Sequence, residues 1–295
     1  MAQTKTQSRP VARIIDAIRT LEGAGFSVRR PFPTAELDHL DPFLLLDEMG
    51  PMELGPGQAE GAPDHPHRGF ETVTYLLDGE FVHADSQGNS GRLAPGDVQW
   101  MTAGDGVVHS EMPTEKIRRD GGRVHGFQIW VNLPRADKRM RPRYQDVKAA
   151  SIPVAESEDG KTRVRIIAGE ALGKRAVIDT RTPITYLHFS LQPGARHVQP
   201  TARDHNVFAY VLGGAVEIGG RTVRDGQLAI LGEGDTVELA ANEPAELLIL
   251  GGKPLGEPVA RYGPFVMNTR AEVMEAIDDF RAGRMGAIPA EIARQ

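Results

Sequence analysis

The chain has 295 residues, with 40 acidic against 34 basic side chains and a net charge of −6 at pH 7, which argues against a generally basic nucleic-acid-binding surface. Its 33 glycines and 21 prolines together make up about 18% of the residues, well above the ordinary share of about 12%. Turns should therefore be abundant and long helices few. Cysteine is absent, which excludes disulfides, thiolate metal sites and a cysteine nucleophile, so any metal must be held by histidine and carboxylate.

The length suits two domains or one large β domain. The first twenty residues contain no apolar signal-peptide core, and no stretch approaches the roughly 18 apolar residues that span a bilayer. We therefore expect a cytoplasmic protein without a membrane segment, and we expect a monomer.

Short runs of β-branched and apolar residues, bounded by Gly, Asn or Asp, recur through most of the chain, a pattern typical of an all-β sandwich or barrel. In the first half the predicted strands are 72–77, 80–84, 98–101 and 127–133. The first two are joined by Asp78-Gly79, a turn sequence that favours hairpins. We expect a hairpin-rich β domain over residues 1–140.

From about Arg135 the sequence becomes polar and charged, without sustained apolar alternation until residues 164–167. We place a linker at residues 141–160. Further strands are predicted at 184–191, 207–212, 215–218, 227–231, 236–239 and 246–250, with Gly-rich turns between them. The sequence thus predicts a second β domain, over 161–295, that is a variation on the first.

One helix is expected at the end of this second domain, over residues 269–283. Thr269 can cap its N-terminus while Glu272, three residues on, completes a capping box, and Gly283 suits the residue after the helix. An apolar stripe on one face is formed by Val273, Ile277 and Phe280. This stripe predicts packing on a sheet, which is a structural role.

Two short segments carry the residues with chemistry, HPHRGFE at 65–71 and GDGVVHSEM at 104–112. Residues i and i+2 of a strand point to the same face, so His65 and His67 would aim two imidazoles into one space. His109 and Glu111 would supply an imidazole and a carboxylate from a second strand. Facing one another inside a barrel, the four form a His3Glu set. On a six-coordinate ion this set leaves two positions open, which suits substrate or O2 better than a closed structural site.

The remaining candidates have plainer expectations. A lone histidine is usually a surface or satisfied core residue, which we expect for His39, His83, His188 and His205. His125 is expected to have a packing role in the barrel. The alternative is that it lies next to the metal ligands and orients them without binding the ion. Glu71 shares strand parity with His65 and His67, so we place it on the same interior as a possible acid behind the ligands.

These residues carry a resemblance to a known family. HPHRGFETVTYLLDGEFVHADSQGNSG, GDVQWMTAGDGVVHSEMP, FQIWVNLP and the closing FVMNTRAEVMEAIDDFRAGRMG resemble the pirin family, a branch of the bicupin superfamily. The resemblance implies an all-β fold of two tandem cupin barrels (double-stranded β-helix, jelly-roll-like) with a short C-terminal helix. It also implies one Fe(II) in the N-terminal barrel, held by His65, His67, His109 and Glu111. Cupins in general place the ligand glutamate where Glu71 stands, whereas pirins place it after the third histidine, as Glu111 stands here.

The second half departs from the pattern of a metal-binding cupin. Where a His-x-His pair is needed it offers Thr201-Ala-Arg-Asp-His205, with His197 isolated upstream. We expect the C-terminal barrel to be structural and free of a metal site.

The resemblance also suggests an activity. Bacterial pirin-like proteins are similar to quercetin 2,3-dioxygenases, which cleave the central ring of a flavonol with O2 and release carbon monoxide. By that resemblance the substrate's 3-hydroxyl binds the metal and a carboxylate takes its proton. Glu111 is the candidate base and Glu71 the alternative. Four apolar residues are candidates for a flat slot around an aromatic substrate, with ordinary barrel core as the alternative: Phe70, Trp100, Met101 and Phe127.

A regulatory role is the alternative function. Some pirins resemble redox-responsive partners of transcription factors or modulators of metabolic enzymes, in which iron senses oxidation state without turnover. A non-oxidative cupin, such as a sugar isomerase, would use the same ligands with another ion. Ligand type alone does not separate iron from manganese, nickel, cobalt, copper or zinc. The basic run 138–143 lies in the predicted linker and is expected to be solvated, so direct nucleic-acid binding is not expected.

Overall fold

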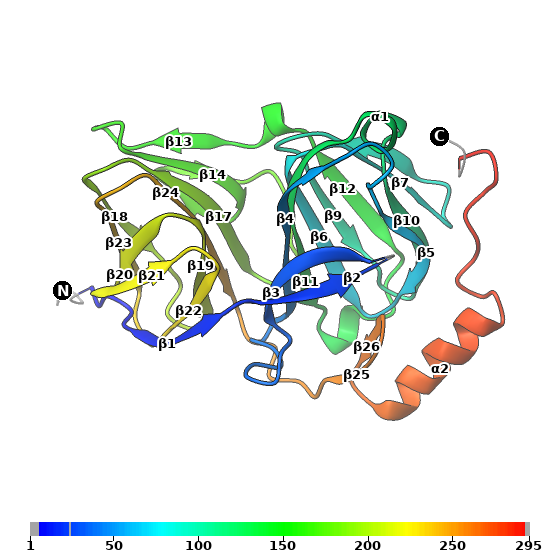
Figure 1. Cartoon of the computed structure of the whole chain (residues 1–295). Coiled ribbons are helices and arrows are strands. Elements are labelled where there is room, and N and C mark those ends of the chain that lie inside the picture. The colour runs from blue at the N-terminus through cyan, green and yellow to red at the C-terminus, as the bar shows by residue number, and fades with distance from the viewer. Residues whose placement is uncertain (1–5, 24, 293–295) are drawn as a thin grey trace. The chain divides into compact units, whose positions relative to one another are not determined.

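The computed structural model describes residues 6–23 and 25–292 and consists mainly of β-strands (Figure 1). The chain forms two compact units. One comprises the segment up to Ile18, Thr34–Asp41 and Ala150–Pro254, and we call it the apolar barrel. The other comprises Arg19–Pro33, Pro42–Ala149 and the segment from Leu255 onward, and we call it the histidine barrel.

The two units are interleaved along the sequence, which corrects the predicted division into 1–140, a linker at 141–160, and 161–295. The N-terminal strand β1 (Val11–Asp16) pairs with β22 (Gln227–Leu231) in the apolar barrel, with Val11 opposite Leu231. The C-terminal segment, with its helix, belongs to the histidine barrel. Strands this far apart in sequence leave no local pattern, so their pairing could not be predicted from the sequence.

Two sheets form the histidine barrel. Seven strands run in the order β12-β9-β6-β11-β4-β3-β2, and four run in the order β5-β10-β7-β8. Their bounds are β2 Ile18–Glu22, β3 Phe26–Phe32, β4 Phe43–Leu54, β5 Ala62–His67, β6 Phe70–Asp78, β7 Phe81–Asp85, β8 Ser90–Leu93, β9 Val98–Thr102, β10 Val107–Pro113, β11 Gly122–Asn132 and β12 Arg143–Val147. A small separate sheet pairs β25 (Ala260–Tyr262) with β26 (Phe265–Met267).

The apolar barrel repeats this plan, with orders β1-β22-β19-β24-β17-β14-β13 and β18-β23-β20-β21. The remaining bounds are β13 Val154–Glu156, β14 Thr162–Ala168, β15 Glu170–Ala171, β16 Lys174–Arg175, β17 Ile184–Leu191, β18 Ala195–Pro200, β19 Asn206–Gly213, β20 Ala215–Ile218, β21 Arg221–Arg224, β23 Thr236–Ala241 and β24 Ala245–Gly252. One cluster of buried apolar side chains from both sheets fills the interior. The predicted all-β fold of two cupin barrels is confirmed.

The predicted strands are all present, but the Asp78-Gly79 turn is not a hairpin. It joins β6 to β7, and these strands belong to different sheets. Gly79 has a φ of +92°, a conformation that glycine adopts without a Cβ clash. The turn therefore carries the chain around a corner of the barrel, a difference that turn chemistry alone does not show.

The segment predicted as a linker contains strands instead. β12 pairs with β9 at the edge of its sheet, and β13 pairs with β14 at the edge of the other. The side chains of β12 are mostly half-buried, so the strand lacks the apolar alternation that marks an interior strand.

Lys138, expected to be solvated, is 1% exposed. Its Nζ donates to Gly69 O at 2.7 Å, Asn132 Oδ1 at 2.6 Å and Val266 O at 3.0 Å, and burial lowers its pKa to about 8.

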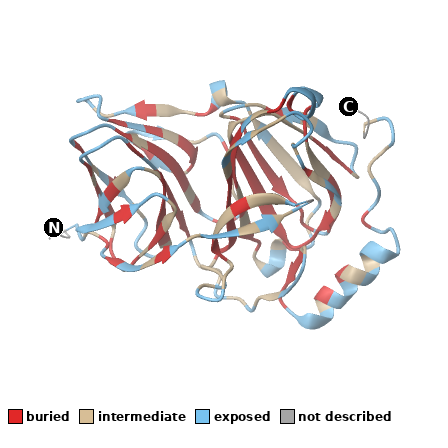
Figure 2. Cartoon of the chain, viewed as in Figure 1, coloured by how far each residue is buried: buried red, intermediate tan, exposed pale blue. Residues whose placement is uncertain are grey.

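The predicted C-terminal helix is confirmed as α2 (Arg270–Arg281). Thr269 Oγ1 accepts a hydrogen bond from Glu272 N at 3.2 Å, and Glu272 Oε2 accepts one from Thr269 N at 2.8 Å, which completes the capping box. The helix buries Val273 and Ala276 against Phe265, Met267 and Val108, while much of its surface is exposed (Figure 2). Phe280 remains 39% exposed, so the predicted stripe is only partly covered.

A second, shorter helix was not predicted. It is α1 (Glu115–Asp120), capped by Thr114, whose side chain accepts a hydrogen bond from Ile117 N. Within the described residues, no helix is long and apolar enough to cross a membrane.

Candidate metal centre

The structure brings the three predicted imidazoles together on two paired strands. His65 on β5 lies directly opposite His109 on β10, and His67 lies opposite Val107. The ring centroids are 4.4 Å apart for His65 and His109, 4.8 Å for His65 and His67, and 4.9 Å for His67 and His109. Potential ligand atoms of the three side chains all lie within 4.8 Å of one another. Two metal–nitrogen bonds of about 2 Å each span at most about 4 Å, so small side-chain movements would bring all three nitrogens to one ion.

The chemistry of this cluster fits a metal ion. His67 Nδ1 and both ring nitrogens of His109 are buried without a hydrogen-bond partner among the described residues. This is an expensive state for polar atoms, and coordination would relieve it for one nitrogen of each ring. His65 Nδ1 lies 2.7 Å from Pro63 O, and donation of its proton to this carbonyl leaves Nε2 free as a ligand atom.

Burial also keeps the imidazoles in the form that binds metals. Burial, followed by the proximity of His65, lowers the pKa of His67 well below its ordinary value near 6.5. Burial also lowers the pKa of His109 well below that value, with smaller effects from His67, His65 and His83. Both rings are therefore neutral near pH 7, as a metal ligand must be.

Glu111 lies beside the cluster but outside it. The pairing register of β10 with β5 shifts between His109 and Glu111, so simple alternation does not carry the glutamate into the group of three. Its Oε1 is 2.9 Å from Thr74 Oγ1, which is also 2.7 Å from Gln128 Oε1. A hydroxyl has one hydrogen and can donate to only one of them at a time. Glu111 lines the same cavity as His65 and His67.

The parity argument for Glu71 does not hold. The turn Arg68–Gly69 interrupts the extended chain, with Gly69 at a φ of +90°, and β5 and β6 lie in different sheets. Glu71 is fully buried, and its Oε1 accepts a hydrogen bond from Thr102 Oγ1 at 2.6 Å. On β6 it alternates with Thr74, so the two side chains point to opposite faces. It is not among the residues that line the cavity.

The cavity has a volume of about 520 Å³. Its polar floor includes Thr74, Gln128 and Asp47, which occupy one register position on the adjacent strands β6, β11 and β4. The sequence argument missed all three, although the alternation of Gln128 with Trp130 in the predicted strand is a signal of a shared face. Apolar parts of the wall come from Phe26, Leu45, Met49, Phe81, Val82 and Trp130.

The residues predicted for an aromatic slot lie elsewhere. Trp100, Met101 and Phe127 are fully buried and do not line the cavity, so they are barrel core. Phe70 packs behind the site, with its ring centroid 5.1 Å from that of His67 and 4.4 Å from that of Trp130.

The other histidines divide as follows. His83 lines the cavity, and its Nε2 lies 3.2 Å from Asp146 Oδ2, so it is closer to the site than expected. His125 is buried with its Nε2 2.9 Å from Glu48 Oε1, the packing role that was expected. His197 Nε2 lies 3.4 Å from Gln199 Oε1. Within the described residues, no metal-binding group of three forms in the apolar barrel.

Two barrels of one plan, one of which gathers three imidazoles with two of them lining a cavity, define a bicupin protein with a candidate metal centre. The Pirin family model matches residues 25–131, and the model of the Pirin C-terminal cupin domain matches residues 186–286. Pirin of Rattus norvegicus is 47% identical over 272 residues, 90% of this chain and 89% of that protein. The chain belongs to the pirin family.

Relatives with other names and solved structures agree with this assignment. A Pseudomonas aeruginosa protein provisionally named a quercetin 2,3-dioxygenase is 43% identical over 272 residues, 91% of this chain and 95% of that protein. The crystal structure of quercetin 2,3-dioxygenase from Acinetobacter baumannii matches with a TM-score of 0.90 and 38% identity, over 96% of this chain and all of that one. A bacterial pirin from Escherichia coli in complex with nickel(II) matches at a TM-score of 0.63 and 21% identity, over 82% of this chain and 99% of that one, which shows a shared fold.

Proposed function

We propose that this protein is a metal-dependent dioxygenase that cleaves flavonols such as quercetin with O2. The observation that carries the proposal is the cluster of three imidazoles, two of which, those of His65 and His67, line a cavity of about 520 Å³. That volume lies within the range of small-molecule sites. The likeness to the Acinetobacter enzyme, at 38% identity and over nearly the whole chain, supports the same activity.

In this proposal His65, His67 and His109 hold the ion, and Glu111 is the fourth ligand after a modest movement of its carboxylate. We propose Fe(II) as the native metal. The three nitrogens and one carboxylate also suit manganese, nickel, cobalt, copper or zinc. Metal affinities follow a general order that is much the same for most donor sets, so these ligands alone do not select one metal.

The bound ion would supply a Lewis-acidic centre with open positions for the substrate and O2. Glu111 would accept the proton of the flavonol 3-hydroxyl, since it lines the cavity and lies two residues after His109 on β10. Thr74 Oγ1 lies 2.9 Å from Glu111 Oε1, and it would orient the carboxylate for this transfer when its hydroxyl donates to Glu111 rather than to Gln128. Glu71 is the weaker candidate base because it points away from the cavity floor.

The cavity walls would position a flat substrate and limit its contact with water. The indole of Trp130 offers an aromatic surface beside His67, with the two ring centroids 5.4 Å apart. Phe26 and Phe81 add apolar surface. Aromatic side chains of this kind bind planar rings through their large apolar area.

The test combines metal analysis with turnover. Protein purified without oxygen is analysed for iron, and O2 uptake and carbon monoxide release are then measured with quercetin. The expected result is one iron per chain and release of carbon monoxide in proportion to the O2 consumed. Stoichiometric iron without turnover would reject the dioxygenase and favour an iron-dependent regulatory partner of a transcription factor or metabolic enzyme.

A further inference from the structure

The turn that follows His67 is held by the C-terminal segment of the chain. Arg68 N donates to Pro264 O at 3.3 Å, and Val266 N donates to Arg68 O at 3.0 Å. The next residue, Gly69, approaches β26 so closely that a Cβ atom there would lie 2.0 Å from Val266 O. The backbone next to a proposed ligand is thus fixed by residues near the other end of the sequence.

The side chain of Arg68 extends this connection to the second ligand strand. It is 3% exposed, and its Nε donates to Asp105 O at 2.6 Å. Asp105 lies in the turn that leads into β10, the strand of His109. One guanidinium therefore joins the end of β5 to the start of β10.

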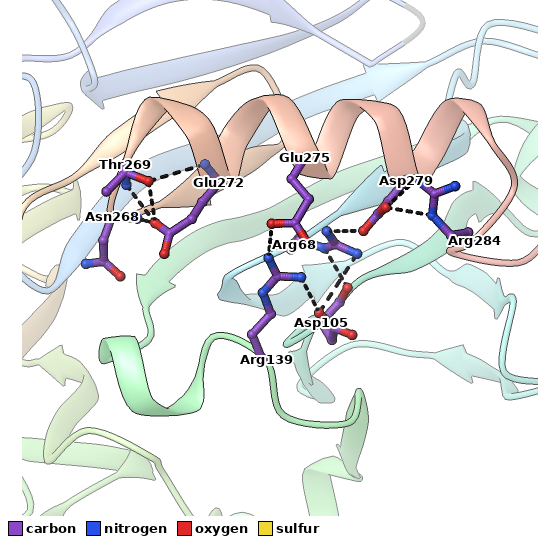
Figure 3. Close-up of polar contacts among 9 residues, drawn as sticks. All are labelled: Arg68, Asp105, Arg139, Asn268, Thr269, Glu272, Glu275, Asp279 and Arg284. Atoms are coloured by element: carbon purple, nitrogen blue, oxygen red, sulfur yellow. Dashed lines mark hydrogen bonds and ion pairs between the residues drawn. The ribbon is translucent and has the colours of Figure 1, made fainter.

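Helix α2 completes the arrangement (Figure 3). Arg68 Nη1 donates to Asp279 Oδ2 at 2.7 Å, and the Asp279 side chain is only 15% exposed. Arg284 Nε donates to the other oxygen of the same carboxylate at 2.6 Å. The helix is itself seated on β10 through Val108, a neighbour of His109 in sequence. It therefore contacts the metal-bearing strands through both a charge pair and an apolar cluster.

A second ion pair on the same helix provides a natural contrast. Arg139 bonds Glu275 at 2.6 Å and Asp105 at 3.1 Å, but the side chains of Arg139 and Glu275 are 40% and 53% exposed. Exposed pairs contribute little because water and salt screen them. A buried pair holds its geometry more strongly because neither partner can exchange the other for water.

We propose that Arg68 and Asp279 are positioning residues of the metal centre: α2 holds Arg68, and Arg68 holds the strands of His67 and His109 at the spacing that the ion requires. The proposal rests on the proposed metal site but not on any dioxygenase activity. Groups that orient metal ligands without touching the ion typically change metal affinity by 10- to 100-fold when removed.

The experiment compares two isosteric changes one helical turn apart on α2. Asp279→Asn and Glu275→Gln each replace a carboxylate that faces an arginine. Metal-free protein is titrated with Ni(II) in competition with a chelating dye, and the visible spectrum of the Co(II) form reports the geometry of the ligands. We expect Asp279→Asn to weaken Ni(II) binding at least tenfold and to alter the Co(II) spectrum. Glu275→Gln should stay within about twofold of the unchanged protein.

Arg68→Lys keeps the positive charge but loses the forked geometry, so it should weaken Ni(II) binding in the same direction as Asp279→Asn. If Asp279→Asn does not fold, Asp279→Glu displaces the carboxylate by one methylene and serves in its place. Unchanged Ni(II) affinity and Co(II) spectrum in a folded Asp279 variant would overturn the positioning role, even if the melting temperature fell. Failure of the unchanged protein to bind Ni(II) or Co(II) would instead remove the metal centre itself, and the positioning role with it.

Discussion

The two barrels share one strand plan but differ in what fills them. The four-stranded sheets correspond in order, with β18 and β23 of the apolar barrel standing where β5 and β10 stand in the histidine barrel. In the histidine barrel the edge strand β5 and its neighbour β10 place His65 opposite His109. In the apolar barrel His197 lies opposite Leu239. One plan therefore supports two different interiors.

The difference shows how the fold separates stability from chemistry. Leu239, Val237 and Phe189 belong to a continuous apolar cluster, which gains the full benefit of removing apolar surface from water. The histidine barrel instead buries polar groups, among them Asp47, His83 and Lys138, and keeps a cavity of about 520 Å³. Buried polar groups are costly unless bonded, so this barrel gives up packing to maintain a site.

The largest effect is expected from His67→Ala, which should lower metal affinity at least about 1,000-fold, or about 4 kcal/mol, and abolish turnover. One of three nitrogens is lost, while the strands keep their own core. Metal content by mass spectrometry and far-UV circular dichroism check the two halves of this prediction. His39→Ala removes a histidine whose side chain is 34% exposed and pairs with Asp38, and it is the matched control. Unfolding of the His67 variant in the absence of metal would show that the histidine is structural.

The three clustered histidines could be found from sequence because their signals are local. His65 and His67 are two apart on one strand, and alternation alone places them on one face. The capping box of Thr269 and Glu272 is similarly local, and it correctly begins α2. Such features depend on a few neighbouring residues whose geometry is nearly independent of the rest of the fold.

The features that sequence missed depend on distant parts of the chain. Glu71 was misplaced because alternation was carried across Arg68–Gly69, where the chain changes sheet. Lys138 looked solvated because its three acceptors lie on Gly69, Asn132 and Val266, two of them remote in sequence. The assignment of α2 to the wrong barrel has the same origin.

The next effect tests the apolar interior. Phe189→Ala should cost about 3–5 kcal/mol of unfolding free energy, because Phe189 is fully buried and its removal leaves a void in a closed core. Phe81→Ala should cost less than about 2 kcal/mol, since Phe81 is half-buried and already borders the cavity. Urea unfolding followed by circular dichroism measures both. Equal losses would show that the two interiors are packed alike.

Acid should act mainly on the histidine barrel. The pKa values of His67 and His109 are lowered in the folded state, so below about pH 6.5 the unfolded chain binds protons that the folded chain does not. Stability of the metal-free protein should therefore be lost as the pH falls below 6.5, by at most about 1.4 kcal/mol per pH unit for each group. At pH 5.5 we expect a loss of about 2 kcal/mol relative to pH 7.5.

Tryptophan fluorescence is a suitable probe for this acid effect because the chain has two tryptophans, Trp100 and Trp130, and both lie in the histidine barrel. His109→Ala should reduce the pH dependence of urea unfolding by about half. A pH dependence that survives replacement of both His67 and His109 would locate the acid-sensitive groups elsewhere. Added metal should oppose the acid effect, because the ion competes with protons for the same nitrogens.

The smallest expected effect tests which of the two barrels α2 stabilises. Thr269→Ala removes the hydroxyl that accepts from Glu272 N and should cost about 1 kcal/mol, the usual loss at a helix cap. If α2 stabilises the histidine barrel, hydrogen exchange should accelerate in α2 and β26 and then in β10, on which the helix packs. Exchange in β17 and β24 should not change, because those strands belong to the apolar barrel. Thr222→Ala, at an exposed position of β21, is the matched control. Faster hydrogen exchange in β17 and β24, with exchange in β10 unchanged, would show that α2 stabilises the apolar barrel, as its position in the sequence suggests.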